Sequence, residues 1–100
     1  MSTAIVTGAS RGLGRALARG LARRGWSLVI DARDSTALNQ AQEELWQLLP
    51  PGSHVVAVAG DVTDREHRHA LAGAAYALGG LDLLVCNAGT LGPRDRKSVV

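Results

Sequence analysis

The sequence predicts an α/β protein built on a doubly wound parallel sheet. Strand-like and helix-like patterns alternate along most of its 100 residues, as they do when helices connect parallel strands. Aromatic residues make up only 3% of the chain, so the core must consist of Ala, Val, Leu and Ile, which suits strands covered on both faces. A glycine-rich turn separates the first strand from the first helix. The length allows one domain at most.

The first three elements are a strand, a helix and a second strand. The first strand is expected over 3–7, around the apolar residues 4–6 and ending where the glycines begin, and the second strand over 27–32. The helix expected over 12–24 ends at Gly25, a residue type common just beyond helix ends. This helix should turn a row of arginines to solvent, opposite a row of leucines. The arginines are Arg15, Arg19 and Arg23, and the leucines are Leu13, Leu17 and Leu21.

The second half of the chain continues the alternation. A helix over 35–49 ends at a Pro-Pro-Gly sequence, and strands are expected over 55–59 and 81–86. The helix between those strands should open with a capping box, in which Thr63 is the N-cap and Glu66 follows three residues later. The core faces of the two helices are expected to carry Leu38, Ala41, Leu45, Leu48 and Leu49, and Leu71, Ala74, Ala75 and Leu78.

Polar or glycine-rich sequences follow the end of every expected strand. In a doubly wound sheet with right-handed crossovers, the strand order expected is 3-2-1-4, in which strands one and four are neighbours. In Rossmann-like sheets of this kind, ligands bind over the carboxyl ends of the strands where the order reverses. The glycine turn, Arg33, Asp61-Val62 and Asn87 all fall at these ends. The sequence therefore predicts a Rossmann-like sheet with a single ligand crevice.

The glycine turn has the spacing Gly-x-x-x-Gly-x-Gly. Gly8 can adopt backbone angles closed to other residues, Gly12 lets the main chain approach a ligand, and Gly14 lets the helix pack close to the strand. The helix that follows points free N–H groups and the positive end of its dipole at the space above the turn. This arrangement is typical of a site for the pyrophosphate of a dinucleotide.

Three motifs resemble those of the short-chain dehydrogenase/reductase family. They are the Thr-Gly-x-x-x-Gly-x-Gly turn, Asp61-Val62 and Asn87-Ala88-Gly89, and the resemblance extends over residues 3–93. It implies an NAD(P)-dependent oxidoreductase that interconverts alcohols and ketones, with residues 1–93 as the cofactor-binding domain and 94–100 as a charged tail. It also implies that Asp61 and Val62 contact adenine. The cofactor-binding residues expected are Gly8, Ser10, Arg11, Gly12, Leu13, Gly14, Arg33, Asp61, Val62, Asn87, Ala88 and Gly89.

The end of the second strand favours NADP(H) over NAD(H). The acidic residue that binds the ribose hydroxyls in NAD-dependent members would fall on Ala32, and strand alternation turns Asp31, one residue earlier, to the opposite face. Arg33 and Arg11 can flank a 2′-phosphate, and Ser10 offers a hydroxyl. In the alternative interpretation, both arginines are ordinary surface residues and Asp31 permits NAD(H).

The sequence does not contain the residues that catalyse the reaction in this family. The family uses a tyrosine and a lysine four residues apart, preceded by a serine. Here Gly80 lies four residues after Tyr76, and the only lysine is Lys97. We therefore name no catalytic residue and expect a partial sheet that stops before the catalytic segment. Alone, the chain should be inactive, and the strand over 81–86, which has no partner on its far side, should promote self-association.

Composition argues against several other classes of protein. The formal net charge of +2 gives no reason to expect nucleic-acid binding. No run approaches the ~20 apolar residues of a membrane span, and no signal-peptide pattern is present, so a cytoplasmic location is expected. Cys86 is the only cysteine, and His54, His67 and His69 are interpreted as surface residues, so no metal site is expected. The alternatives left open are a non-catalytic nucleotide-binding module and another Rossmann-like enzyme, such as a methyltransferase. The substrate also stays open.

Overall fold

A parallel sheet between two layers of helices forms the frame of the molecule. The computed structural model describes residues 2–87, so Ala88, Gly89, Lys97 and the expected tail 94–100 lie outside the described residues. The strands are β1 (Thr3–Val6), β2 (Ser27–Ala32), β3 (Val55–Ala59) and β4 (Leu83–Val85), and the helices are α1 (Gly12–Arg23), α2 (Ser35–Leu48) and α3 (Arg65–Ala77). The strand order is β3-β2-β1-β4, which confirms the predicted topology.

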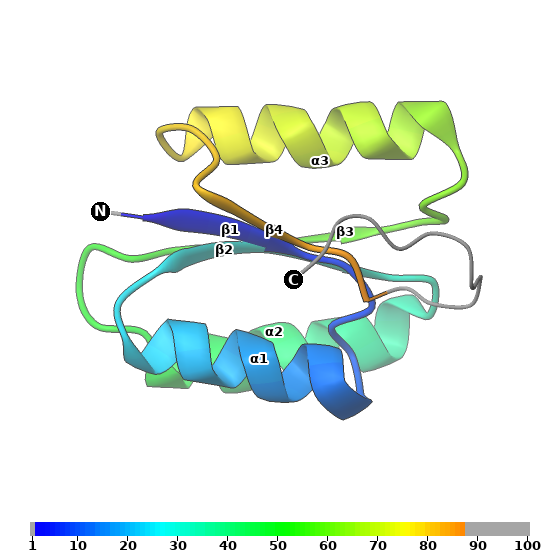
Figure 1. Ribbon diagram of the computed structural model, residues 1–100. Coiled ribbons are helices and arrows are strands. Elements are labelled where there is room, and N and C mark those ends of the chain that lie inside the picture. Colours follow the sequence, from blue (N-terminus) through cyan, green and yellow to red (C-terminus); the bar gives the residue numbers. More distant parts are fainter. Residues whose placement is uncertain (1, 88–100) are drawn as a thin grey trace.

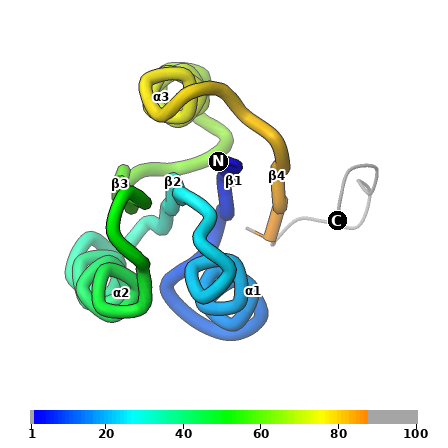
Figure 2. Tube along the Cα trace, turned by 90° about the vertical axis from the view of Figure 1, so that its left-hand side faces the viewer, coloured from blue at the N-terminus to red at the C-terminus, as the bar shows by residue number. Residues whose placement is uncertain are grey.

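Helices cover both faces of the sheet. Helix α3 lies on one face, and α1 and α2 lie side by side on the other (Figures 1 and 2). Alternate residues of β2 point to the two sides, since Leu28 and Ile30 pack with the α1 and α2 layer while Val29 packs with Leu71 of α3. The predicted core faces of α2 and α3 are confirmed. In the described part of the chain, no helix is long and apolar enough to cross a membrane.

The predicted orientation of α1 is wrong. Its buried residues are Gly14, Ala18 and Ala22, whereas Leu13 is 65% exposed and Leu17 is 37% exposed. A Cβ atom added to Gly14 would collide with the backbone of the turn that precedes the helix. Helix α1 therefore lies so close to the sheet that its stripe of small residues fits between them, Leu13 and Leu17 are displaced toward solvent, and only Leu21 of the predicted face packs, partly buried, against the core.

The arginine row of α1 is also different from the prediction. Arg15 Nε and Arg19 Nε donate to the two carboxylate oxygens of Glu44 on α2, at 2.9 and 2.8 Å. These two arginines therefore connect the helices of one layer, and the interpretation of the row as a merely solvated face fails for them. Arg23 is exposed at the end of the helix.

The N-cap of α3 is shifted by one residue from the prediction. Asp64, not Thr63, is the N-cap, and its side chain accepts a hydrogen bond from the Glu66 N–H at 3.0 Å. The Thr63 hydroxyl donates instead to Asp61 Oδ1 at 2.9 Å. The turn after β3 thus uses Thr63 to hold Asp61, and the next carboxylate begins the helix.

Candidate nucleotide-binding site

A cavity of about 520 Å³ lies at the carboxyl ends of the strands. Residues that follow all four strands line it: Gly8, Ser10, Arg11, Gly12, Leu13, Asp31, Ala32, Arg33, Asp34, Gly60, Val62, Thr63 and Asn87. Eight of the predicted cofactor-binding residues are among them. Gly14 and Asp61 are not lining residues but contact residues that are. The topology has therefore brought most of the predicted set, scattered over 80 positions in the sequence, around one hollow.

The glycine turn has the backbone geometry that its sequence requires. Gly8 and Gly12 both have a φ of 62°, in the left-handed region where glycine alone carries no penalty. Helix α1 begins at Gly12, and the side chain of its N-cap residue, Arg11, makes no capping hydrogen bond. The first N–H groups of α1 are therefore available to an anion in the cavity, as in other helix N-termini that bind phosphate.

Asn87 is fixed beside this turn through Thr7. The Asn87 N–H donates to Thr7 Oγ1 at 2.8 Å, and the Thr7 hydroxyl donates to the Val85 carbonyl at 3.3 Å. A Cβ atom on Gly14 would lie 2.7 Å from Asn87 Nδ2 and closer still to the Gly8 carbonyl oxygen. The turn, the start of α1 and the end of β4 are thus packed into one unit that tolerates no side chain at position 14.

Charged side chains flank the cavity on the far side of the turn. Arg33 is exposed, and its guanidinium lies 3.6 Å from Asp61 Oδ2. Hydrogen bonds from the Thr63 N–H and hydroxyl hold the pKa of Asp61 below its ordinary value of 3.8, and the charge of Arg33 lowers it further. Asp61 is therefore a carboxylate near neutral pH and can accept hydrogen bonds from a ligand.

Asp31 forms a buried pair with His67 beneath the cavity. Asp31 is 1% exposed; its Oδ1 accepts the Gly8 N–H at 2.8 Å, and its Oδ2 lies 2.7 Å from His67 Nε2. The prediction that Asp31 turns away from Ala32 is confirmed, because Asp31 faces α3. The interpretation of His67 as a surface residue is wrong. Its spacing of four residues from Leu71 was the available signal, since it places His67 on the core face of α3.

Tyr76 lies away from this cavity. It is 83% exposed and close to the C-terminal end of α3, whereas the cavity is lined by residues that follow the strands and precede the helices. Because α3 runs antiparallel to the strands, its first residues lie at the carboxyl ends of the strands and its last residues lie at the amino ends (Figure 1). Tyr76 thus has no place in chemistry at the cavity.

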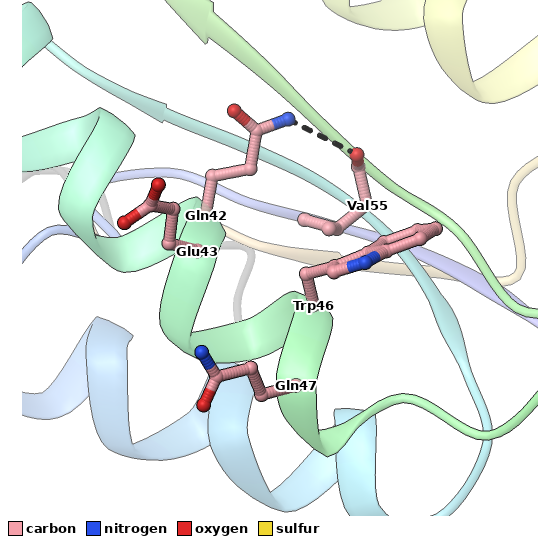
Figure 3. Close-up of a pocket in the computed structure, with 5 residues that line it drawn as sticks. All are labelled: Gln42, Glu43, Trp46, Gln47 and Val55. Atoms are coloured by element: carbon pink, nitrogen blue, oxygen red, sulfur yellow. Dashed lines mark hydrogen bonds between the residues drawn. The ribbon is translucent and has the colours of Figure 1, made fainter.

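A second hollow lies along α2 beside the first residue of β3. It is lined by Gln42, Glu43, Trp46, Gln47 and Val55, and Gln42 Nε2 donates to the Val55 carbonyl at 3.2 Å (Figure 3). Val55 is at the amino end of its strand, whereas the glycine turn lies at the carboxyl ends of the strands. No glycine turn or helix N-terminus contributes to this hollow, so it is not the candidate nucleotide site.

Comparisons with known proteins agree with this geometry. Residues 2–99 match the model of the short chain dehydrogenase family. The chain belongs to this family. It is 43% identical over 95 residues to a hydroxyacyl-CoA dehydrogenase of Mycobacterium tuberculosis, an alignment that covers 93% of this chain and 29% of that enzyme. This family membership excludes the alternative of a methyltransferase.

Solved structures of family members superpose closely. The L-sorbose reductase of Gluconobacter frateurii, complexed with NADPH and L-sorbose, aligns with a TM-score of 0.81 at 34% identity, covering 99% of this chain and 37% of that one. The apo glucose dehydrogenase of Caenorhabditis elegans aligns with a TM-score of 0.81 at 32% identity, covering 90% of this chain and 38% of that one. The chain therefore spans about a third of the length of the relatives it matches.

Proposed function

We propose that this chain is the cofactor-binding part of an NADP(H)-dependent oxidoreductase that interconverts a carbonyl compound and an alcohol. The observation that carries the choice of cofactor is the state of the two acidic residues at the end of β2, Asp31 within the strand and Asp34 just after it. Both oxygens of Asp31 are engaged inside the protein, and Asp34 caps α2 by accepting from the Thr36 and Ala37 N–H groups. Asp31 is therefore not an unengaged carboxylate for ribose hydroxyls, as an NAD(H) site would favour, and one oxygen of Asp34 is committed to the helix cap.

The residues present fit such a dinucleotide. The pyrophosphate would lie over the glycine turn, where Gly14 leaves no room for a side chain and α1 presents its N-terminus. The 2′-phosphate would lie between the exposed guanidinium groups of Arg11 and Arg33, which can donate paired hydrogen bonds to phosphate oxygens. The adenine would lie against Val62, with the Asp61 carboxylate as an acceptor for its amino group. When bound, the nicotinamide would supply or accept the hydride.

Two further facts support this proposal. The L-sorbose reductase that superposes on this chain was solved with NADPH, as was an actinorhodin polyketide ketoreductase that aligns with a TM-score of 0.79 at 33% identity. The substrates named for the relatives include a sugar, a polyketide and an acyl-CoA. We therefore propose a small-molecule carbonyl or alcohol as substrate and go no further in naming it.

Calorimetric titration with NADPH and NADH tests the assignment. The chain should bind NADPH more tightly than NADH, because NADH has no 2′-phosphate for Arg33 to contact. Arg33→Ala removes a charge-assisted contact of roughly 1.5 to 3 kcal/mol, so NADPH binding should weaken about tenfold or more while NADH binding stays the same. The matched control is Arg23→Ala, an exposed arginine that does not line the cavity. Equal affinity for the two nucleotides in the wild type would refute the NADP(H) assignment.

A further inference from the structure

The buried Asp31–His67 pair enters the function proposed above only through the Asp31 carboxylate, and that function gives His67 itself no role. His67 is 7% exposed and joins three segments: it faces Asp31 on β2, it belongs to α3, and it packs against Gly60 after β3. A Cβ atom on Gly60 would lie 2.8 Å from His67 Cε1 and closer to Nδ1. The chain therefore keeps position 60 free of a side chain beside this imidazole.

The pair connects α3 to the sheet and also contacts the phosphate-binding turn. Asp31 Oδ2 lies 2.7 Å from His67 Nε2, and Oδ1 of the same carboxylate accepts the N–H of Gly8, the first glycine of the turn. The orientation of the Gly8 peptide thus depends on Asp31, and the orientation of Asp31 depends on His67. Apolar residues would fill the same space, so packing alone does not account for two ionisable side chains here.

The charge of Asp31 also affects the binding of a phosphate above the turn. A carboxylate directly beneath a bound phosphate is repelled by it, and this repulsion is strong where water is excluded. An imidazolium beside the carboxylate would offset the repulsion, and histidine is the side chain that gains a proton near neutral pH. Asp31 faces His67 from β2, and Asp61, itself paired with Arg33, acts on it electrostatically from the loop after β3. The side chains that β1 and β3 turn toward α3 in this core cluster are apolar.

We propose that His67 is a positioning residue for the phosphates of the dinucleotide: through Asp31 it fixes the Gly8 N–H, and it takes up a proton when phosphate binds above the turn. The inference rests on the proposed function. It adds that nucleotide binding is coupled to protonation of a residue that does not touch the nucleotide. By linkage, binding that takes up a proton weakens as the pH rises.

Calorimetry of NADPH binding in pairs of buffers with different ionisation enthalpies measures the proton uptake directly. The wild-type chain should take up a fraction of a proton between about pH 6 and 8, and its affinity should fall by up to about tenfold per pH unit where uptake approaches one proton. His67→Gln keeps a side-chain N–H donor but cannot become charged, so its uptake should fall. Asp31→Asn should lower the uptake as well. His69→Gln, an exposed histidine on the same helix, is the control and should behave as the wild type.

The outcomes separate this inference from the function on which it rests. The 2′-phosphate itself titrates near pH 6, so the imidazole contribution is the difference in uptake between the wild type and His67→Gln. Tight NADPH binding with no such difference would overturn the inference and leave the proposed function intact. A wild type that binds neither NADPH nor NADH would overturn both. If His67→Gln fails to fold, the wild type still decides, because NADH has no 2′-phosphate and its binding should also take up a proton.

Discussion

Gly14→Ala should destabilise the protein although alanine is the better helix former. The new Cβ would lie 2.7 Å from Asn87 Nδ2 and closer to the Gly8 carbonyl oxygen. That oxygen belongs to the backbone of the turn and cannot rotate away, so the overpacking cost falls near the upper end of the range, at about 3 kcal/mol. Alanine in place of glycine within a helix regains about 1 kcal/mol. The net loss in the free energy of unfolding is thus about 2 kcal/mol.

Gly20→Ala is the matched control, because Gly20 lies in the same helix and an added Cβ there meets nothing within 4 Å. It should raise the free energy of unfolding by about 1 kcal/mol, so the same substitution should have opposite effects on stability at two sites of α1. Thermal unfolding should show Gly14→Ala melting roughly 8 °C or more below the wild type and Gly20→Ala melting a few degrees above it. A Gly14→Ala protein as stable as Gly20→Ala would refute the close packing of α1 on the turn.

Two further predictions concern stability and association. Burial raises the pKa of Glu44, but hydrogen bonds from Arg15 and Arg19 outweigh it and hold the pKa below 4.5. Glu44→Gln should therefore lower the free energy of unfolding by only about 0.5 to 1 kcal/mol at neutral pH, because the side chains of Glu44 and the two arginines are each about a third exposed. Urea unfolding should show that this difference from the wild type disappears as the pH falls below 4.5. The chain alone should oxidise no NADPH with a panel of carbonyl compounds. Light scattering should show that the chain self-associates, since among residues 2–87 β4 pairs only with β1 and Leu84 is 43% exposed. Turnover of any carbonyl, or a monomer that persists at high concentration, would contradict these expectations.

The fold could be predicted because its signals are local. The bounds of β2 and β3 match the expected ranges 27–32 and 55–59, since each contains an apolar run and lies between clear breaks. The strand order follows from a doubly wound sheet with right-handed crossovers. Strand β4 covers Leu83–Val85, three residues instead of the six expected, because it pairs only where Ala4, Ile5 and Val6 of β1 oppose it.

The packing of α1 could not be predicted from periodicity. The helix carries two stripes of nonpolar residues, one of leucines and one of Gly14, Ala18 and Ala22. Hydrophobicity favours the leucines as the core face, but the choice is decided by the distance between helix and sheet, which the glycine turn sets. Only small residues fit at that distance. The glycines of the turn and the alanines of the helix are therefore parts of one packing arrangement, which the helical period does not reveal.

Long-range pairing bears on the environment of His67 and on the proposal of NADP(H) as the cofactor. Strand alternation indicates the face to which Asp31 points, and the spacing from Leu71 indicates the face of α3 on which His67 lies, but no local pattern predicts that these two residues, 36 positions apart, form a pair. The pairing weakens the NAD(H) alternative. A ribose hydroxyl that displaced the Gly8 N–H or the His67 imidazole from Asp31 would leave a buried group unsatisfied, at a cost of about 1 to 3 kcal/mol. A 2′-phosphate at the exposed Arg33 displaces only an ion pair of 3.6 Å with Asp61, which contributes little at the surface. The energetic difference between these two exchanges favours the phosphate.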